Sequence, residues 1–368
     1  MSGYTLAAVG DIMLDRTIGR RFAEQPHEFE LTDVASVLKS HDIVFANLEN
    51  PVASSGARHP KQDPNVCFRA HPSTLQVLRN LGVNAVSIGN NHLLDYGPDA
   101  LVETQVHLDR AGIKWAGAGR TYAEANRPLE MDVRGQRVAI FSRCFVHSAS
   151  TRRATPTRPG VADYRVESLL HDIRAYQSRG YDVHVSVHWG IEYSFYPITY
   201  QRRWARQMID AGARLILGHG PHYPQGFEDY RDGRIVYSLG NFVFDEPMKF
   251  TKRSFVFGTR LEPAGLGPTQ VHPVHAADGL PHLVVGRPAD RMTGLLDAMS
   301  RRYRTMSRTE WQRVDNDWFR DMVWRTRTMG SARFFRLAPP SFFLGLGLKN
   351  YVKKAIPRRL RELIGGRR

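Results

Sequence analysis

The stretch Ser87-Ile88-Gly89-Asn90-Asn91-His92-Leu93-Leu94-Asp95-Tyr96-Gly97 decides the fold, because a short apolar run gives way within it to a cluster of polar side chains. The run begins two residues earlier, at Ala85. Short apolar runs of this kind are typical of buried strands, and α/β enzymes place their chemistry just past the carboxyl ends of such strands. Polar groups after one strand become evidence for a site when other strands of the chain end in the same way.

Six short apolar runs in the first 245 residues end in this way. They are 6–9 before Gly10-Asp11, 43–46 before Asn47-Leu48-Glu49, 85–88 before Gly89-Asn90-Asn91-His92, 183–187 before His188-Trp189-Gly190, 215–217 before Gly218-His219-Gly220-Pro221-His222, and 236–239 before Gly240-Asn241. Helical patterns lie between several of them, at 72–81, 98–111, 166–179 and 201–211. Buried parallel strands read as continuous apolar runs, so the alternation predicts an α/β layered fold whose polar strand ends gather along one edge.

The rest of the chain divides into an antiparallel part and a basic helical part. Segments 226–239, 255–261 and 282–285 are strand-like and are separated by Gly and Pro, which is typical of antiparallel strands. From about residue 290 the pattern becomes helical and strongly basic. We therefore expect a main domain over residues 1–290 and a basic, partly amphipathic helical extension over residues 291–368.

Composition limits the chemistry that the chain can carry. Of its 368 residues 42% are hydrophobic, as in a globular protein with a sizeable core. Its two cysteines, Cys67 and Cys144, are too few for a disulfide framework or for a cysteine-based zinc site. Metal ligands would therefore come from His, Asp, Glu and Asn, which suit hard or borderline divalent ions.

The N-terminal residues Met1 to Thr5 lead directly into the first apolar run, without the basic segment and long hydrophobic region of a secretory signal. No uninterrupted apolar run approaches the ~20 residues needed to span a bilayer. The sequence therefore predicts a cytoplasmic protein with neither a signal peptide nor a transmembrane helix.

The polar strand ends offer the ligands of a divalent metal ion. Carboxylates, an amide oxygen and imidazoles are all present, on Asp11, Glu49, Asn91, His92, His188, His219 and His222. Single residues also have ordinary structural roles, since Asp11 could cap a helix, Glu49 could be solvated, and His188 could be a hydrogen-bonded core histidine. Because six strand ends carry such groups together, we interpret them as one metal site.

The combined motifs resemble a known family. Gly10-Asp11, Asn47-Leu48-Glu49, Gly89-Asn90-Asn91-His92, His188-Trp189-Gly190, Gly218-His219-Gly220-Pro221-His222 and Gly240-Asn241, in this order over about residues 4–260, resemble the CapA family. These are capsule and poly-γ-glutamate synthesis proteins related to the calcineurin-like metallophosphoesterases. The resemblance implies a layered α/β/β/α sandwich with a metal centre at the strand ends, and it leaves the basic extension uncovered.

The resemblance also implies a role for each residue of the predicted site. The metal ligands would be Asp11, Glu49, Asn91, His188, His219 and His222. The catalytic residues would be His92 as the proton-transfer group, Asp95 as the partner that orients it, and Asp11. Metallophosphoesterases usually carry Asp-x-His and Gly-Asp in their first two motifs, whereas this chain has Met13 and Asn47-Leu48-Glu49 there. One or two divalent ions are therefore implied, with Mn, Zn, Fe, Ca and Mg left open.

Residues just past other strand or turn positions are candidates for substrate binding, namely Arg69, Glu192 and Tyr193. Their ordinary alternatives are a surface ion pair for Arg69 and coverage of the sheet edge for Tyr193. The substrate that the resemblance implies is an acidic polymer or a peptide, such as capsule material or poly-γ-glutamate.

Three functions remain open for the predicted site. A divalent ion beside a histidine acid favours hydrolysis of the phosphoesterase type. The same His and Asp pairs would also serve a metal-dependent peptide epimerase, which removes and returns an α-proton. A non-catalytic, membrane-associated scaffold of polymer synthesis would keep the fold without turnover.

The basic extension holds most of the net charge of +15, with 19 Lys and Arg against 6 Asp and Glu in residues 291–368. Within residues 334–368, Phe and Leu cluster around Pro339-Pro340 and a run of basic residues follows. This combination favours contact with an anionic membrane surface on the cytoplasmic side. The alternative is a cradle for an acidic polymer. We expect no nucleic acid partner, because the basic residues form no module that reads bases.

Overall fold

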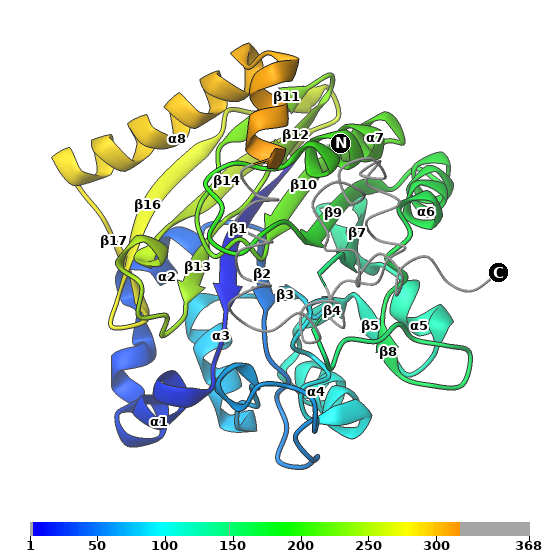
Figure 1. The fold of residues 1–368 in the computed structure, drawn as a ribbon, viewed down its shortest axis with the longest axis vertical. Coiled ribbons are helices and arrows are strands. Elements are labelled where there is room, and N and C mark those ends of the chain that lie inside the picture. The colour runs from blue at the N-terminus through cyan, green and yellow to red at the C-terminus, as the bar shows by residue number, and fades with distance from the viewer. Residues whose placement is uncertain (1–2, 147, 317–368) are drawn as a thin grey trace, which may run out of the picture. The chain divides into compact units, whose positions relative to one another are not determined.

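Two β-sheets stacked face to face form the centre of the molecule, and helices cover the outer side of each (Figure 1). The computed structural model describes residues 3–146 and 148–316. In the first sheet the strands run in the spatial order β17 (Leu280–Leu283), β16 (Gln270–Ala277), β14 (Arg253–Glu262), β1 (Tyr4–Ile12), β2 (Ile43–Leu48), β3 (Ala85–Ser87) and β4 (Lys114–Ala116), with β13 (Asn241–Val243) beside β1 and β15 (Gly265–Leu266) beside β14. The strands from β1 to β4 and β13 pair in parallel, and β14 to β17 pair antiparallel.

The second sheet has a parallel centre and two antiparallel edges. Its strands run in the order β11 (Phe227–Tyr230), β12 (Gly233–Val236), β10 (Ala213–His219), β9 (Asp182–His188), β7 (Gln136–Cys144) and β6 (Leu129–Val133). The edge strands β6 and β11 are the antiparallel ones. A small separate pair joins β5 (Ala118–Gly119) to β8 (Gly160–Val161).

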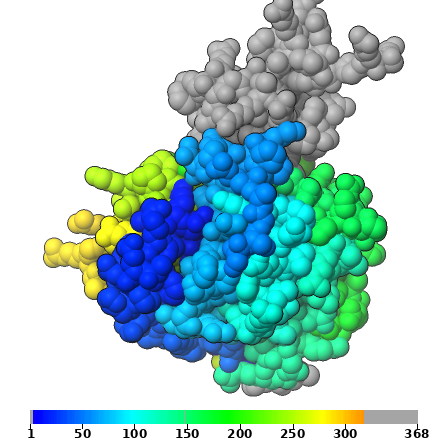
Figure 2. Space-filling view, turned by 90° about the horizontal axis from the view of Figure 1, so that it is seen from below, coloured from blue at the N-terminus to red at the C-terminus, as the bar shows by residue number. Residues whose placement is uncertain are grey.

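The helices divide between the two outer faces of the sandwich. The first sheet is covered by α1 (Arg16–Glu24), α2 (Thr32–Leu38), α3 (Leu75–Leu81) and α4 (Gly97–Ala111), and the second by α6 (Val166–Ser178) and α7 (Thr199–Asp210). The helix α8 (Arg287–Thr305) contacts β16 of the first sheet and β11 of the second. Other helical segments of the described residues are α5 (Tyr122–Asn126), the 3-10 turns η1 (Pro26–Glu30), η2 (Pro64–Val66), η3 (Pro72–Thr74) and η4 (Lys249–Lys252), and residues 308–316. On the side of α1, α3 and α4 the surface is built mainly by the N-terminal part of the chain (Figure 2).

Alternation of side chains along each strand produces the layers. In β1, Leu6 and Ala8 pack between the two sheets, whereas Ala7 and Val9 pack against the outer helices. Neighbouring residues of a strand point to opposite faces, so a strand that is buried on both faces must be apolar throughout. The layered α/β/β/α sandwich that the sequence predicted is confirmed.

The four predicted helices form α3, α4, α6 and α7, with bounds within about three residues of the predicted ones. In α7 the side chains of Ala205, Met208 and Ile209 are buried, and their spacing of three and four residues places them on the face that meets the second sheet. In α4, Pro98 lies in the first turn and Gly112 ends the helix with a φ of 71°. Glycine adopts this left-handed conformation without the steric cost of a Cβ.

The sixth apolar run, residues 236–239, was predicted to be one strand, and the structure differs from this prediction. The strand β12 ends at Val236, and the chain then crosses from the second sheet to the first, where Asn241 begins β13. Gly240 makes this crossing with a φ of 75° and accepts a 2.9 Å hydrogen bond from the backbone N of Asp11. Glycine is required at position 10, because a Cβ there would meet the backbone O of Gly240, and at position 240, because its φ is left-handed. The apolar character of the run therefore reflects burial between two sheets.

The helix α8 belongs to the main body of the chain, although the sequence placed it in the extension that starts near residue 291. Residues 1–311 form one compact unit. Leu296, Met299 and Tyr303 are buried against the sheets, and the hydroxyl of Tyr303 accepts a 3.1 Å hydrogen bond from the backbone N of Gly226. The compact unit therefore includes α8, and the division of the chain into a main domain and a basic extension stays a prediction.

The predicted membrane segment, residues 334–368, lies outside the described residues. Within residues 3–146 and 148–316, no helix combines the length and the apolar character that crossing a bilayer requires.

Candidate metal centre

The polar ends of parallel strands from both sheets meet at one edge of the sandwich. Asp11 lies near the end of β1, opposite Asn47 of β2 and Asn241 of β13. In the second sheet His188 closes β9 and lies opposite His219, which closes β10. Because neighbouring strands run in parallel, their carboxyl ends coincide, and side chains that are far apart in the sequence become neighbours.

Asp11 is the centre of this cluster and is completely buried. Its Oδ1 accepts a 2.8 Å hydrogen bond from Nδ2 of Asn47 and lies 3.3 Å from Nδ1 of His219. Its Oδ2 lies 3.3 Å from Nδ1 of His222 and accepts a 3.3 Å hydrogen bond from the backbone N of Gly220. Nitrogen atoms from both sheets therefore surround this carboxylate.

Glu49 supplies a second carboxylate directly after β2 and is also completely buried. Its Oε1 lies 3.7 Å from Nε2 of His188 and 3.7 Å from Nε2 of His222. One potential ligand atom from each of Asp11, Glu49 and His188 lies within 4.8 Å of the other two. These distances leave room for a cation at about 2.0–2.3 Å from each ligand atom.

Several oxygen and nitrogen atoms of the cluster are suited to bind a divalent ion, because the protein provides no hydrogen-bond partner for them. Both carboxylate oxygens of Glu49, Oδ1 of Asn91 and Nε2 of His219 are buried without a hydrogen-bond partner. A buried polar group without a partner costs about 1–3 kcal/mol. Several such groups in one place call for a shared compensating group, and this mixture of oxygen and nitrogen atoms suits a borderline or hard cation.

Burial and neighbouring charge act in opposite directions on the ionisable groups. Burial favours a raised pKa for Asp11, but hydrogen bonds and charge from His219 and His222 hold that pKa well below its usual value. Burial, reinforced by the charge of Asp11, raises the pKa of Glu49 well above its usual value. Burial opposes protonation of His222, yet the charges of Glu49 and Asp11 raise its pKa to about 10. Two buried carboxylates thus need a positive charge between them, which a protonated His222 or a metal ion can supply.

Burial has the opposite outcome at His188, whose pKa it lowers to about 3. The neutral imidazole is the form that binds a metal ion, so His188 is ready to act as a ligand at neutral pH without first losing a proton.

His92 and Asp95 form a hydrogen-bonded pair beside the cluster, in the segment between β3 and α4. Nδ1 of His92 lies 2.8 Å from Oδ2 of Asp95, which is completely buried. The same oxygen accepts a 3.0 Å hydrogen bond from the backbone N of Phe68. The ring of Phe68 packs on the His92 ring with their centroids 4.5 Å apart. These contacts fix the orientation of the His92 ring.

Hydrogen bonds made by Asn90 hold its neighbour Asn91 next to the cluster. Nδ2 of Asn90 donates to the backbone O of Leu48 at 2.7 Å and to Oδ1 of Asn47 at 3.3 Å. The segment that carries Asn91 is thereby tied to the end of β2. Its role as a ligand stays a prediction.

Two asparagines orient the histidines of the cluster, and the sequence analysis gave neither of them a role. Nδ2 of Asn47 lies 3.3 Å from Nδ1 of His188, and Oδ1 of Asn241 lies 2.8 Å from Nδ1 of His222. An acceptor such as Oδ1 of Asn241 fixes the ring orientation of a metal-binding histidine. The sequence signal that could have identified both asparagines was their position at strand ends, because both stand inside the motifs.

Residues 5–246 match the family described as "Bacterial capsule synthesis protein PGA_cap". The chain belongs to this family. The PGA_cap match spans all six predicted ligands. It is supported by the capsule biosynthesis protein CapA of Bacillus anthracis, 33% identical over 288 residues that cover 75% of this chain and 68% of the relative. The PGA biosynthesis protein CapA of Bacillus subtilis (strain 168) is 30% identical over 274 residues, 74% of this chain and 72% of the relative. The resemblance to the CapA family is confirmed.

Among solved structures, the NAD nucleotidase NadN of Haemophilus influenzae aligns with a TM-score of 0.43 and 10% identity, over 87% of this chain and 60% of that chain.

Of the predicted substrate-binding residues of this PGA_cap protein, Arg69 is engaged with its own surroundings. Its Nη1 donates to the backbone O of Ser55 at 3.2 Å and of Gly56 at 3.1 Å. Its guanidinium carbon lies 4.3 Å from the centroid of the Tyr96 ring. Arg69 thus holds the loop at residues 55–56, and a contact with substrate stays a prediction.

Tyr193 and Glu192 lie on the other side, next to His222. The Tyr193 ring centroid is 6.0 Å from that of His222, and its hydroxyl donates to Oε2 of Glu246 at 3.4 Å. The φ of Tyr193 is 66°, a conformation that is costly for a residue with a Cβ and that clusters at functional sites. Glu192 is exposed, and its charge is one of those that raise the pKa of His222.

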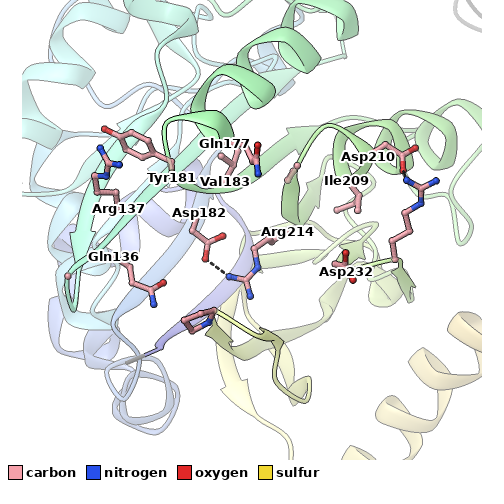
Figure 3. Close-up of a pocket in the computed structure, with 16 residues that line it drawn as sticks. Gln136, Arg137, Gln177, Tyr181, Asp182, Val183, Ile209, Asp210, Arg214 and Asp232 are labelled. Atoms are coloured by element: carbon pink, nitrogen blue, oxygen red, sulfur yellow. Dashed lines mark hydrogen bonds and ion pairs between the residues drawn. The ribbon is translucent and has the colours of Figure 1, made fainter. Parts of the chain in front are cut away.

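A separate cavity of about 640 Å³ lies where β7, β9 and β10 begin, away from the strand ends that form the cluster (Figure 3). In its centre Nη1 of Arg214 donates to Oδ2 of Asp182 at 2.6 Å. Arg231 pairs with Asp210 at 2.8 Å. Oδ1 of Asp182 is buried without a hydrogen-bond partner, but in the cluster around Asp11 several such atoms, from Glu49, Asn91 and His219, gather in one place. That cluster is therefore the better candidate for chemistry.

Proposed function

We propose that this protein is a metal-dependent hydrolase that cleaves a bond during synthesis or processing of an extracellular polymer. The observation that carries the proposal is the buried cluster around Asp11, in which carboxylate, amide and imidazole atoms from both sheets lack hydrogen-bond partners beside the His92–Asp95 pair. Membership of the capsule synthesis family supports the polymer as the substrate class.

Asp11, Glu49, Asn91, His188, His219 and His222 would hold the divalent ion. When bound, the ion would polarise the oxygen of the attacked group and make water a stronger nucleophile at neutral pH. One or two ions would be held, and the position of Met13 where related enzymes carry histidine leaves fewer ligands for a second.

His92 would supply the proton that the leaving group needs. In the reaction the oxygen of water bonds to phosphorus or to a carbonyl carbon, the bond to the leaving group breaks, and the departing oxygen or nitrogen takes a proton from Nε2 of the protonated ring. Asp95 binds Nδ1, so Nε2 is the nitrogen directed to the reaction. The proton taken from water then restores the ring.

Turnover of a generic phosphodiester and of a γ-glutamyl peptide, with metal content measured on the same sample, tests the proposal. His92→Ala should lower kcat at least ~100-fold, as expected for loss of a positioned proton donor. The control is His107→Ala, because His107 also pairs with a carboxylate, Glu103 at 3.2 Å, but lies on the surface of α4. A metal-loaded protein that turns over neither substrate, or an active His92→Ala variant, would overturn hydrolysis. Deuterium uptake at a peptide α-carbon without cleavage would instead support epimerisation.

We also propose that residues 334–368 contact an anionic membrane surface. The support is compositional, since Phe and Leu precede a run that includes Lys353, Lys354, Arg358 and Arg359. The full chain should co-sediment with vesicles that contain anionic lipid at low salt, and replacing these four residues by Gln should release it. Equal binding of both proteins would contradict the proposal. Binding of poly-γ-glutamate that the same replacement abolishes, without vesicle binding, would favour the polymer cradle.

A further inference from the structure

A loop from the second sheet reaches the segment that carries Asn91 and His92. After β7, the hydroxyls of Ser148 and Thr151 lie 2.7 and 3.1 Å from the backbone O of Asn91. Ser150 lies between them, with its Oγ 2.9 Å from Oγ of Ser148. These three hydroxyls form a cluster that fastens the first sheet's catalytic segment to the second sheet.

Ser150 differs from the other two hydroxyls in its partner. Its Oγ donates to Oδ1 of Asp95 at 2.7 Å, and it is 3.4 Å from the backbone O of Asn91. The shorter contact takes the hydroxyl proton, because a hydrogen bond to a charged oxygen is the stronger one. Ser150 is 3% exposed and Asp95 is completely buried, so water cannot replace this bond.

The two oxygens of Asp95 have separate partners. Oδ1 receives the hydroxyl of Ser150, whereas Oδ2 receives the backbone N of Phe68 at 3.0 Å and faces Nδ1 of His92 at 2.8 Å. A carboxylate that is bound at one oxygen only can rotate about its Cβ–Cγ bond. Bonds at both oxygens fix its plane, and the plane of the carboxylate determines whether Nδ1 of His92 keeps its proton.

We propose that Ser150 is a positioning residue, which locks the carboxylate of Asp95 and so keeps His92 in the tautomer with the proton on Nδ1 and Nε2 directed to the substrate. The inference rests on the proposed function for its catalytic meaning. The hydrogen-bond chain itself, from Ser150 through Asp95 to His92, runs across the gap between the two sheets. A loop of one sheet thereby sets the orientation of the proton-transfer group of the other.

The first test reads the tautomer of His92 directly, in the full chain without substrate. A long-range ¹⁵N–¹H spectrum, assigned with His92→Ala, should show a single tautomer with the proton on Nδ1. Ser150→Ala should give a mixture of tautomers, and Ser150→Thr should restore the single form. Ser300→Ala is the matched control, because Ser300 of α8 is also a buried hydroxyl but bonds to backbone atoms of Leu296 and Phe227, and it should leave the His92 signals in place.

The second test uses turnover of the best substrate found for the wild-type protein. Ser150→Ala should lower kcat about 10- to 100-fold with KM and metal content unchanged. An unchanged tautomer and unchanged kcat in Ser150→Ala, or an equal disturbance in Ser300→Ala, would overturn the inference. If the wild-type protein turns over no substrate, the proposed hydrolysis fails, but the tautomer spectra still decide the role of Ser150.

Discussion

Oδ1 of Asp11 and Nδ1 of His219 lie 3.3 Å apart although they belong to different sheets of the sandwich. Their approach means that the candidate metal centre exists only when the two sheets are stacked in one particular way. Fold and site are therefore coupled, and changes at the site should alter the stability of the whole sandwich as well as metal content.

Replacement of His188 by Ala should reduce the affinity for a divalent ion at least ~10-fold, because a neutral buried imidazole is lost from the cluster. Elemental analysis after dialysis, followed by metal titration, measures the change. His184→Ala is the matched control, because His184 lies four residues before His188 in β9 and is also completely buried. Equal metal loss in both variants would argue against a ligand role for His188.

Removal of metal should lower the melting temperature of the wild-type protein. Bound metal stabilises the folded state, by about 2.7 kcal/mol when the free ion is present at 100 times its Kd. Chelation also leaves His222 as the group that balances the charges of Asp11 and Glu49. Thermal unfolding with and without a chelator measures the effect, and His188→Ala should show a much smaller difference. An equal melting temperature with and without the chelator would contradict a metal ion in this cluster.

Stability should fall between about pH 6.5 and pH 4 because of His184. Burial lowers the pKa of this residue to about 4 in the folded chain, whereas an unfolded chain titrates near pH 6.5. Between these pH values the unfolded state binds a proton that the folded state does not bind. The free energy of unfolding is therefore lower by about 3 kcal/mol below pH 4. Urea unfolding at several pH values measures the slope. It should be shallower in His184→Asn, and parallel slopes would refute the assignment.

Gly10→Ala should destabilise the protein by at least about 3 kcal/mol. A Cβ at this position would lie 1.8 Å from the backbone O of Gly240, where the chain passes from the second sheet to the first. The 2.9 Å hydrogen bond from Asp11 to the same oxygen prevents the strands from moving apart. Denaturant unfolding provides the measurement. Gly294→Ala in α8 is the control, because no atom lies within 4 Å and the change should stabilise the helix by about 0.5–1 kcal/mol.

Sequence reasoning recovered the parts of the fold in which burial on two faces leaves a continuous apolar run. The strands at Leu6, Val44, Val185 and Ile216 were found for this reason, and the polar residues after them marked the edge where the cluster lies. The helices α1 and α2 were not predicted. The predicted strand at 236–239 was misplaced because Tyr237 to Gly240 are buried without being part of a strand.

The contacts that tune the candidate site were not predictable from residue type. Ser148, Ser150 and Thr151 stand in a loop whose composition is ordinary for a turn, and only the stacking of the sheets brings them to Asn91 and Asp95. Likewise, the hydrogen bonds from Arg69 to the backbone oxygens of Ser55 and Gly56 were not predictable from its residue type, and its contact with substrate stays a prediction. Long-range approach determines such roles, and a single sequence does not report it.

The pairing of β1 also affects how the chain assembles during synthesis. Tyr4 lies opposite Leu261 of β14, so one side of the first strand is completed by residues that leave the ribosome late. Until Arg253 and its successors emerge, a nascent chain exposes a long apolar strand edge in the middle of its future sheet. During this interval, mispairing of the exposed edge with other chains competes with folding.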